Sequence, residues 1–350
     1  MTLSHVRIVG SGLIGTSIGL GLALKGVGVT MVDSDGRAQS LARDLVKSSP
    51  SADIDLTIFA TPLGAVKSLL DGEFSANPHS AFIDIGSVKS KVKVEVSTSS
   101  MPLNRFLPTH PMAGREMGGA ESARADLFQG RAWIVDSQGV DSDVIARASE
   151  LIEFLGAHKV DLDSSEHDKA VALISHLPQL VSSLLAKQLD GGEAGWLELA
   201  GAGLRDTTRI AASDAKLWRE IITANSQAIK PLLEKLQSDV GALIGSLDDE
   251  SSVAQVIEEG QRGRARIPGK HGGKAREYTY LPIVIEDKPG QLAALFDECA
   301  TAGVNVEDLS IEHSPGQFTG LITLALSQMD AEKLGDHLKA HGWSVHSPRR

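Results

Sequence analysis

Hydrophobic residues follow two different spacings along the chain, and the spacing changes near residue 164. Before that point, short runs rich in Val and Ile alternate with helical stretches, which is typical of a parallel sheet whose strands are joined by helices. These runs predict strands at His5–Val9, Val27–Val32, Leu56–Ala60, Ala81–Ile85, Ala132–Asp136 and His158–Leu162. Residues 1–163 are therefore expected to form one α/β domain.

From residue 164 to 257 the apolar residues recur at helical spacing, most clearly in Ala170–Leu189 and Ala215–Leu247. Pro178 cannot donate a backbone hydrogen bond to the carbonyl of Ile174, so we expect a kink or break there. Long apolar helices need a surface to bury against, and a second copy of the chain is a natural candidate. This segment is expected to be all-helical and to form a homodimer.

The last part of the chain begins with a segment rich in Gly and basic residues, Glu258–Tyr278, which predicts a linker or an extended arm. Residues 279–350 then show the order strand, helix, strand, strand, helix, strand. We expect them to form a third, separate domain.

Composition narrows the class of protein. The chain has 350 residues, 42% hydrophobic and 23% charged, which is an ordinary globular balance. Its one cysteine, Cys299, excludes an internal disulfide and a Cys-based metal site, and no metal is expected. The formal charge of −11 argues against nucleic acid and anionic membranes as partners. The apolar runs stop short of the roughly 18 residues of a membrane span, and no leader is visible, so we expect a cytoplasmic protein.

A glycine-rich turn follows the first predicted strand: Gly10-Ser11-Gly12-Leu13-Ile14-Gly15. The first glycine permits the tight turn, the second lets the backbone approach a pyrophosphate, and the third allows the helix to pack closely on the strand. Such a motif alone is weak evidence, but here a strand precedes it and a helical run follows. The pattern predicts a dinucleotide-binding domain of the Rossmann type, with Gly10, Gly12, Leu13, Ile14 and Gly15 at the cofactor.

The choice of cofactor depends on Asp33, which ends the second predicted strand. Its carboxylate can accept hydrogen bonds from ribose hydroxyls and repels a 2′-phosphate, which favours NAD over NADP, although nearby Arg37 weakens this preference. By itself Asp33 could equally be a turn residue. Thr61 and Pro62, directly after the third strand, are assigned to the same site.

Four further segments carry a resemblance. They are Asp84-Ile85-Gly86-Ser87-Val88-Lys89, Thr109-His110-Pro111-Met112-Ala113-Gly114-Arg115-Glu116, Ser175-His176-Leu177-Pro178 and Asp206-Thr207-Thr208-Arg209-Ile210-Ala211. In this order they resemble the prephenate/arogenate dehydrogenase family over nearly all of residues 5–245. The resemblance implies oxidation of prephenate by NAD with decarboxylation to 4-hydroxyphenylpyruvate, a step of tyrosine biosynthesis.

The resemblance also implies roles for residues. His110 is the base for the hydroxyl proton, Ser87 hydrogen-bonds to it and to the substrate, and both are expected just past sheet strands. Arg209 would bind a substrate carboxylate, and His176 would be a second polar contact. Arg115 and Glu116 are also placed at the substrate.

Taken singly, these residues have plainer interpretations. His110 could lie in an ordinary loop, His176 could be a hydrogen-bonded core histidine, and Arg209 could be a solvated helix residue. Lys89 could sit near phosphate, but a water-facing side chain is slightly favoured. The joint pattern, rather than any one residue, supports the catalytic assignment.

Residues 279–350 resemble an ACT domain, which implies regulation by an amino acid, here tyrosine. The turn after the first strand and the following helix start offer backbone N–H groups to a carboxylate. The regulatory ligand is assigned to Asp287, Gly290, Gln291, Leu292 and Asn305. The alternative is a purely structural or dimerising domain.

Other functions are left open by the sequence. Arogenate could replace prephenate as the substrate. A β-hydroxyacid dehydrogenase would need a catalytic lysine in the helical part, and Lys169 and Lys187 have no matching motif. A non-catalytic sensor of NAD and amino acids would tolerate loss of Ser87, His110 or Arg209, yet all three are present. Three positions depart from the family pattern and affect pocket shape: Gln179, Arg115 and Ala202.

Overall fold

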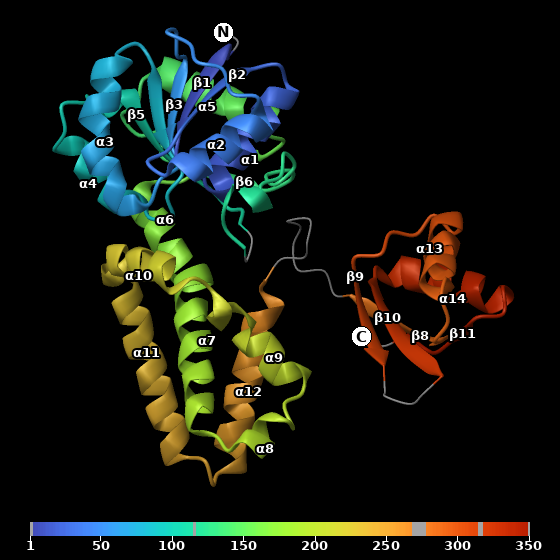
Figure 1. Cartoon of the computed structure of the whole chain (residues 1–350). Coiled ribbons are helices and arrows are strands. Elements are labelled where there is room, and N and C mark those ends of the chain that lie inside the picture. Colours follow the sequence, from blue (N-terminus) through green and yellow to red (C-terminus); the bar gives the residue numbers. More distant parts are fainter. Residues whose placement is uncertain (1–2, 115–116, 268–277, 314–317, 349–350) are drawn as a thin grey trace. The chain divides into compact units, whose positions relative to one another are not determined.

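The computed structural model describes residues 3–114, 117–267, 278–313 and 318–348. The chain divides into two compact units, one up to Asp239 and one from Val240 onward, and each is described by itself (Figure 1).

A seven-stranded sheet forms the first part of the N-terminal unit, with the strand order β2-β1-β3-β4-β5-β6-β7. Its strands are β1 (His5–Val9), β2 (Gly28–Val32), β3 (Leu56–Phe59), β4 (Ala81–Asp84), β5 (Phe106–Pro111), β6 (Ala132–Val135) and β7 (His158–Asp161). The six strands predicted from the sequence are all present, and their ends agree to within one residue. The predicted α/β architecture is confirmed.

Two features of this sheet differ from the prediction. Strand β5 was missed because Pro108 and Pro111 argue against a strand. The sheet is also mixed rather than parallel throughout, since β6 runs antiparallel to β5, with Thr109 opposite Val135. A parallel neighbour needs a crossover connection, usually a helix, but the described residues between β5 and β6 form only the single turn η2 (Ala120–Ser122).

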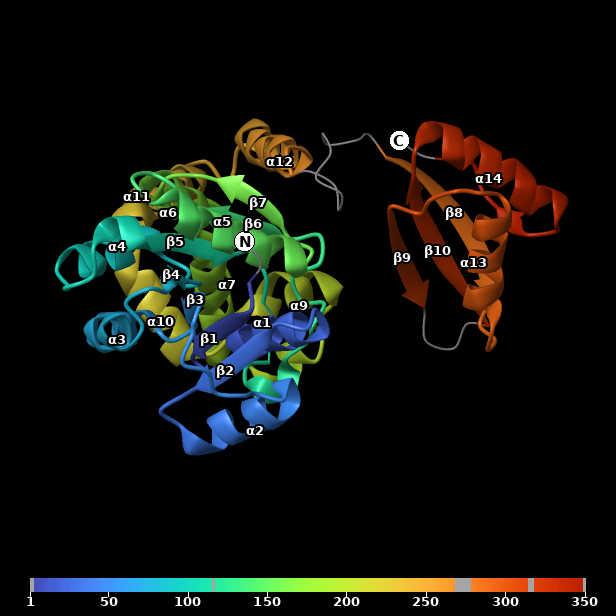
Figure 2. The same cartoon turned by 90° about the horizontal axis from the view of Figure 1, so that it is seen from above.

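Helices cover both faces of the sheet (Figures 1 and 2). Successive strand residues point to opposite faces, so Ile8 and Ile58 pack in one core while Val9 and Phe59 pack in another. The first core is completed by α1 (Leu13–Leu24), α2 (Gly36–Val46) and α5 (Ser142–Phe154), the second by α3 (Leu63–Ala76) and α4 (Lys89–Ser97). The turn η1 (Leu103–Arg105) leads into β5.

Helices make up the rest of this unit. They are α6 (Ser164–Val171), η3 (Ala172–His176), α7 (Leu177–Gln188), η4 (Leu189–Gly191), α8 (Ala194–Leu197), α9 (Ala202–Thr208), η5 (Arg209–Ala212), α10 (Ala215–Ala224) and most of α11 (Ser226–Gly245). The expected irregularity at Pro178 is confirmed, because η3 is a turn of π-helix ending just before it. The proline has no N–H for the usual bond, and the wider turn accommodates this.

The continuous helical stretch Ser164–Gly191 is 28 residues long with a mean hydropathy of 1.3 in its most apolar window, enough by length and composition alone to cross a membrane. From the sequence, the apolar runs were expected to stop short of such a length. In the structure 28% of that window is buried inside the protein. Three polar residues of the helix, His176, Gln179 and Ser182, are buried and hydrogen-bonded within the protein.

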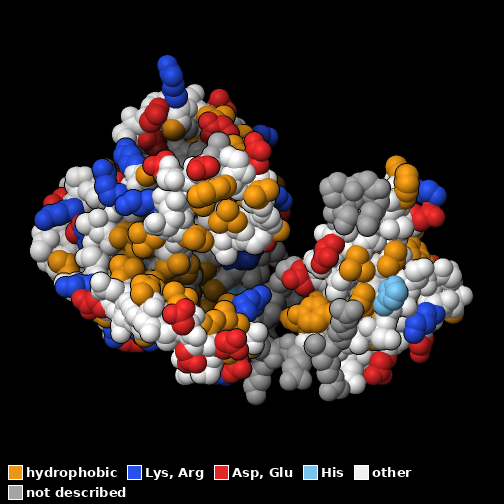
Figure 3. All heavy atoms as spheres, turned by 90° about the horizontal axis from the view of Figure 1, so that it is seen from below, with side chains coloured by type: hydrophobic (Ala, Val, Ile, Leu, Met, Phe, Trp, Pro, Cys, Tyr) orange, Lys and Arg blue, Asp and Glu red, His pale blue; other side chains and the backbone are white. Residues whose placement is uncertain are grey.

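Many large apolar side chains remain exposed on these helices. Their relative exposures reach 63% at Ile174, 50% at Leu184 and 64% at Trp196. Figure 3, which views the chain from below, shows hydrophobic side chains gathered on this face. Patches of this kind usually mark an interaction surface.

The C-terminal unit contains α12 (Glu250–Ala265), which corrects the predicted linker. Residues 258–265 are the last turns of this helix rather than part of an extended arm. Asp249 caps the helix by accepting from the N–H groups of Ser251 and Ser252, and Glu259 pairs with Arg262 one turn later. These local interactions outweigh the cost of Gly260 and Gly263. Residues 268–277 of the predicted linker lie outside the described residues.

A four-stranded antiparallel sheet follows, in the order β11-β8-β10-β9. Its elements are β8 (Thr279–Glu286), α13 (Gln291–Thr301), β9 (Asp308–His313), β10 (Thr319–Leu326), α14 (Gln328–Ala340) and β11 (Ser344–Val345). The predicted order of strands and helices is confirmed. A core that includes Ile283, Leu295, Ile322 and Leu334 joins both helices to the sheet.

Candidate active site

The glycine-rich turn lies between β1 and α1 and has the shape of a dinucleotide cradle. Gly10 has φ +115°, and a Cβ there would lie 2.2 Å from the carbonyl oxygen of Ala60. A Cβ on Gly15 would lie 2.1 Å from the Gly10 oxygen, so the helix approaches the turn closely. Around Gly12 there is open space, and no side chain caps the start of α1. Its first N–H groups are thus available to an anionic ligand.

Two buried hydroxyls beside this turn test whether a dinucleotide fits. Among the described residues, the side-chain oxygens of Ser11 and Thr61 are buried without a hydrogen-bond partner. Buried polar atoms rarely lack a hydrogen-bond partner, so a polar ligand bound at this place would supply partners for these two hydroxyls. Asp33 also lies here, accepting from the N–H of Ser11 at 2.6 Å. Leu13 and Ile14 form the first turn of α1, and Pro62 is the residue before α3.

A chain of three side chains begins at His110, which is in β5 and not past a strand as predicted. His110 Nδ1 lies 2.9 Å from Nε2 of His167, and His167 Nδ1 lies 2.8 Å from Oδ1 of Asp168. Both oxygens of Asp168 are also held by backbone N–H groups, that of Lys89 at 2.8 Å and that of Ser90 at 2.9 Å. The sheet therefore contributes the first histidine, and α6 contributes the other two residues.

These contacts determine where the protons lie. An ionised carboxylate only accepts, so His167 donates from Nδ1 to Asp168, and in its neutral form it accepts at Nε2. His110 must then donate from Nδ1, which leaves its Nε2 with a free lone pair. Burial acts to raise the pKa of Asp168, but hydrogen bonds from His167, Lys89 and Ser90 outweigh it and lower that pKa. The carboxylate of Asp168 thus stays ionised, and each of the three side chains keeps its role as hydrogen-bond donor or acceptor.

His110 is also kept neutral. Its pKa is held well below the ordinary value by burial first, then by the positive charge of Lys89 and by the two neighbouring histidines, His167 and His176. A neutral imidazole with an open Nε2 can take a proton from a substrate hydroxyl.

Lys89 does not face water, which corrects the sequence-based preference. The side chain is 1% exposed, and its Nζ bonds to the buried carboxylate of Asp84 and to the carbonyl of Thr109 at 2.6 Å. Burial lowers the pKa of Lys89 and raises that of Asp84, while each group opposes the shift of the other. This pair ties the carboxyl ends of β4 and β5 together directly behind His110.

His176 lies in the π-helical turn and is 1% exposed. The amide nitrogen of Asn225 donates to the carbonyl of Asp168 at 2.7 Å and lies 3.0 Å from Nδ1 of His176. Because that nitrogen only donates, His176 accepts at Nδ1 and carries its proton on Nε2. Burial lowers the pKa of His176 to about 4, so it is a neutral donor. The ring of Trp218 stands edge-on to it, 6.1 Å between centroids.

Arg209 begins η5, and its side chain is exposed. The segment around it is fastened to α7, the helix that follows His176. Gln179 donates to the carbonyl of Ile210 at 3.0 Å, and the hydroxyl of Ser182 donates to that of Thr207 at 2.8 Å. Gln179, one of the departures from the family pattern, is therefore a buried support for the Arg209 segment.

Within the part of the chain that the structure describes, the other expected site residues make no hydrogen bond to His110. Ser87 is half-buried in the loop after β4, and among the described residues His110 bonds to His167 rather than to Ser87. Arg115 and Glu116 lie outside the described residues. Sequence reasoning missed His167, Asp168 and Asn225. The only signal was the adjacent pair His167-Asp168 near the start of a predicted helix, which is too common to single out.

The expected regulatory residues occupy two places in the C-terminal sheet. Asp287 and Gly290 lie in the turn after β8, with Gln291 and Leu292 in the first turn of α13. Asn305 precedes β9. The backbone N–H of the nearby Glu307 donates to the carbonyl of Ala325, which pairs with Tyr280 at the start of β8. Since β8 and β9 both run antiparallel to β10, Asn305 lies at the opposite end of the sheet from Asp287. One chain does not bring them together.

Comparison with known proteins gives one family for two consecutive segments that together span residues 18–255. Residues 18–161 match the model of the prephenate dehydrogenase nucleotide-binding domain, and residues 163–255 match that of the prephenate dehydrogenase dimerization domain. The chain is 31% identical to a protein named as a probable prephenate dehydrogenase of Streptomyces niveus, covering 97% of this chain and 99% of that one. It is 28% identical to the prephenate dehydrogenase of Lactococcus lactis, covering 90% and 92%.

Solved structures show the same fold. The prephenate dehydrogenase of Aquifex aeolicus, in complex with hydroxyphenyl propionate and NAD+, has a TM-score of 0.67 at 23% identity, covering 75% of this chain and 98% of that one. The arogenate dehydrogenase of Synechocystis has a TM-score of 0.62 at 24% identity, covering 74% and 98%. At these identities the likeness concerns architecture alone.

Proposed function

Because the chain belongs to the prephenate dehydrogenase family, we propose that it oxidises prephenate with NAD and decarboxylates it to 4-hydroxyphenylpyruvate. One observation carries the proposal. The relay from Asp168 through His167 leaves Nε2 of His110 unprotonated, at the same edge of the sheet as the dinucleotide cradle. This is the arrangement that oxidation of a carbinol requires.

In this proposal His110 acts as the base. Nε2 takes the hydroxyl proton as the C–H bond of the carbinol carbon breaks, which turns that carbon into a ketone. NAD supplies the acceptor for the hydride. The bond to the ring carboxylate then breaks and carbon dioxide leaves. The electron pair of that bond completes the aromatic ring and leaves the former ketone oxygen as a phenolate, which takes back the proton from His110 and becomes the phenol. While His110 holds that proton, its positive charge is stabilised through His167 by the ionised carboxylate of Asp168.

The remaining residues bind and orient. His176 donates from Nε2, Arg209 binds a carboxylate of the dianionic substrate, and Ser87 contacts the reacting hydroxyl. Arg115 and Glu116 are assigned to the substrate by family pattern only. For the cofactor, Gly12 admits the pyrophosphate, while Gly10 and Gly15 allow the tight turn and the close approach of the helix. Asp33 holds the ribose, and Ser11 and Thr61 offer their buried hydroxyls. Asp33 favours NAD over NADP.

We further propose that two copies pair through the exposed apolar helices of residues 164–257, which the match to a dimerization domain supports. The assigned domains are 1–163 for NAD, 164–257 for substrate and dimerisation, and 279–350 as an ACT-type regulatory domain. The opposed positions of Asp287 and Asn305 mean that a tyrosine site using both needs residues from two chains. A cytoplasmic location is part of the same proposal.

The direct test mixes the purified chain with NAD and prephenate and follows the absorbance of NADH. Turnover with prephenate, and a lower kcat/KM with arogenate and with NADP, is the expected result. A higher kcat/KM with arogenate would reassign the substrate. NAD binding without turnover on either compound would favour the sensor alternative and refute the enzyme.

Regulation is tested separately by adding tyrosine. The full chain should be inhibited, and a chain ending before residue 279 should keep its activity but lose the response. Inhibition that survives truncation would place tyrosine at the active site as a product-like competitor.

A further inference from the structure

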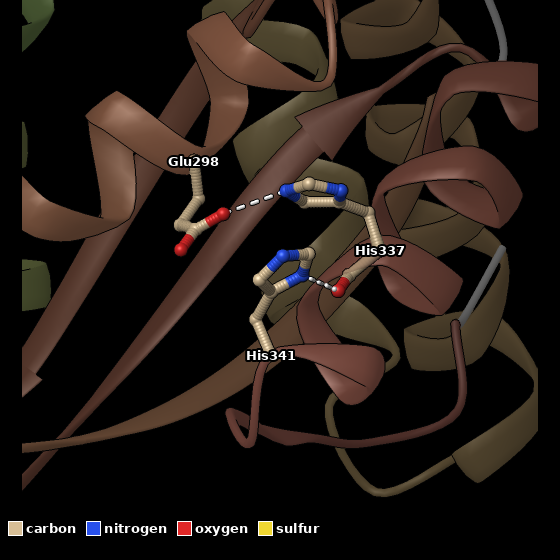
Figure 4. A group of neighbouring side chains, drawn as sticks. All are labelled: Glu298, His337 and His341. Carbon is tan, nitrogen blue, oxygen red and sulfur yellow. Dashed lines mark hydrogen bonds and ion pairs between the residues drawn. The ribbon is translucent and has the colours of Figure 1, made fainter.

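We propose that Glu298, His337 and His341 form a binding site for a divalent transition-metal ion such as Zn²⁺ (Figure 4). Glu298 projects from α13, His337 from α14, and His341 directly follows α14. The two histidines are four residues apart, a spacing that places both on one face of a helix. One potential ligand atom from each of the three side chains lies within 4.8 Å of the others.

His341 is already in the form that binds a metal. Its Nδ1 lies 2.8 Å from the backbone oxygen of His337, and a carbonyl can only accept. Nδ1 therefore carries the proton in the neutral ring, and Nε2 has a free lone pair. In Figure 4 the second nitrogen of His341 lies on the side of its ring that is nearer to His337 and Glu298. Metal-binding histidines in proteins commonly donate their other N–H to a carbonyl in this way.

His337 and Glu298 complete the set. Nε2 of His337 lies 2.6 Å from Oε2 of Glu298, and the rings of His337 and His341 are 4.3 Å apart between centroids. A metal ion would take the place of the proton shared by His337 and Glu298, so the proton is released as the ion binds.

The donor set selects the kind of ion. Two imidazoles and one carboxylate suit Zn²⁺ and similar ions, whereas Ca²⁺ and Mg²⁺ prefer oxygen ligands alone. Three protein ligands leave at least one position for water. No metal was expected from the sequence, but the single Cys299 excludes only cysteine-based sites, and this site uses no cysteine. Its physical effect would be to clamp α13 to α14, the two helices that cover the C-terminal sheet.

The test titrates Zn²⁺ into the full-length chain after treatment with a chelator, using calorimetry, and repeats the titration with Mg²⁺. Co²⁺ is added in parallel, since its visible absorption reports the coordination of the ion. The variants are His341→Ala and Glu298→Gln, with His346→Ala as the control, because His346 is an exposed histidine of the same domain outside the cluster. His341 is exposed after the end of its helix, and circular dichroism checks that each variant is folded.

Both site variants should bind Zn²⁺ at least about tenfold more weakly, since even outer partners of a metal site change affinity about 10–100-fold. The control should bind like the wild type, and Mg²⁺ should give no signal. Equal Zn²⁺ affinity in His341→Ala would overturn the proposal. That result would leave a plain hydrogen bond between two helices and would place the bound ion elsewhere in the chain.

Discussion

Replacing His167 by Phe removes the middle of the relay while keeping a ring of similar shape. His110 Nδ1 then loses the acceptor that lies 2.9 Å away, and Asp168 keeps its two backbone donors but loses the histidine. Without an acceptor at Nδ1, the proton of His110 is no longer held on that nitrogen. A fraction of the enzyme then carries it on Nε2, where it blocks the base.

The size of the effect follows from the burial of this pair. A buried donor left without its acceptor costs about 1–3 kcal/mol. Every 1.4 kcal/mol corresponds to about a factor of ten in rate, so kcat should fall roughly tenfold to a hundredfold. The cradle for NAD does not touch His167, so NAD affinity should not change.

The assay measures kcat and KM for prephenate by NADH absorbance, and NAD affinity by fluorescence quenching. His79→Phe serves as the control, because this exposed histidine follows α3, before β4, on the opposite edge of the sheet. Unchanged kcat in His167→Phe would show that the relay does not orient His110. An equal loss in NAD affinity would show that the variant disturbs the fold instead.

The remaining predictions concern single side chains. His110→Asn should lower kcat at least about a hundredfold with NAD affinity retained, and near-normal turnover would remove His110 as the base. Arg209→Ala should raise KM for prephenate at least about tenfold with little change in NAD affinity; an unchanged KM would place the carboxylate elsewhere. Asp33→Ser should narrow the ratio of kcat/KM between NAD and NADP, and a wild-type preference for NADP would contradict the assignment. Because burial lowers the pKa of His176 from 6.5 to about 4, the unfolded chain binds this proton first as pH falls, so the free energy of unfolding should decrease between those values. Urea unfolding of His176→Gln should show a shallower decrease, and an equal slope would mean that other groups cause it.

The sequence predicted the strands with Val and Ile runs almost to the residue, because their burial on both faces leaves a continuous apolar signal. It failed at β5, where Pro108 and Pro111 hide a strand that is held by its neighbours. It failed again at residues 258–265, where capping and ion pairs extend a helix through glycines that locally favour a loop. In both cases, contacts with other residues stabilise a strand or helix that the local amino-acid composition argues against.

The candidate site divides in the same way. Residues in motifs, such as the cradle glycines and His110, could be proposed from the sequence because the spacing within each motif is local. His167 and Asp168 were not, because their role depends on β5 and α6 meeting across 57 residues of chain. The prediction that the Lys89 side chain faces water was wrong for a related reason. Its partner Asp84 becomes buried only when β4 and β5 pair.

The relay joins a strand of the sheet to the first helix beyond it, and this makes the chain suited to fragment complementation. A cut between residues 161 and 163, where the two family matches meet, would leave His110 on one fragment and His167 with Asp168 on the other. Neither fragment alone would hold an oriented base. Activity would then report reassembly of the two fragments directly, because it requires the hydrogen bond between the imidazoles of His110 and His167.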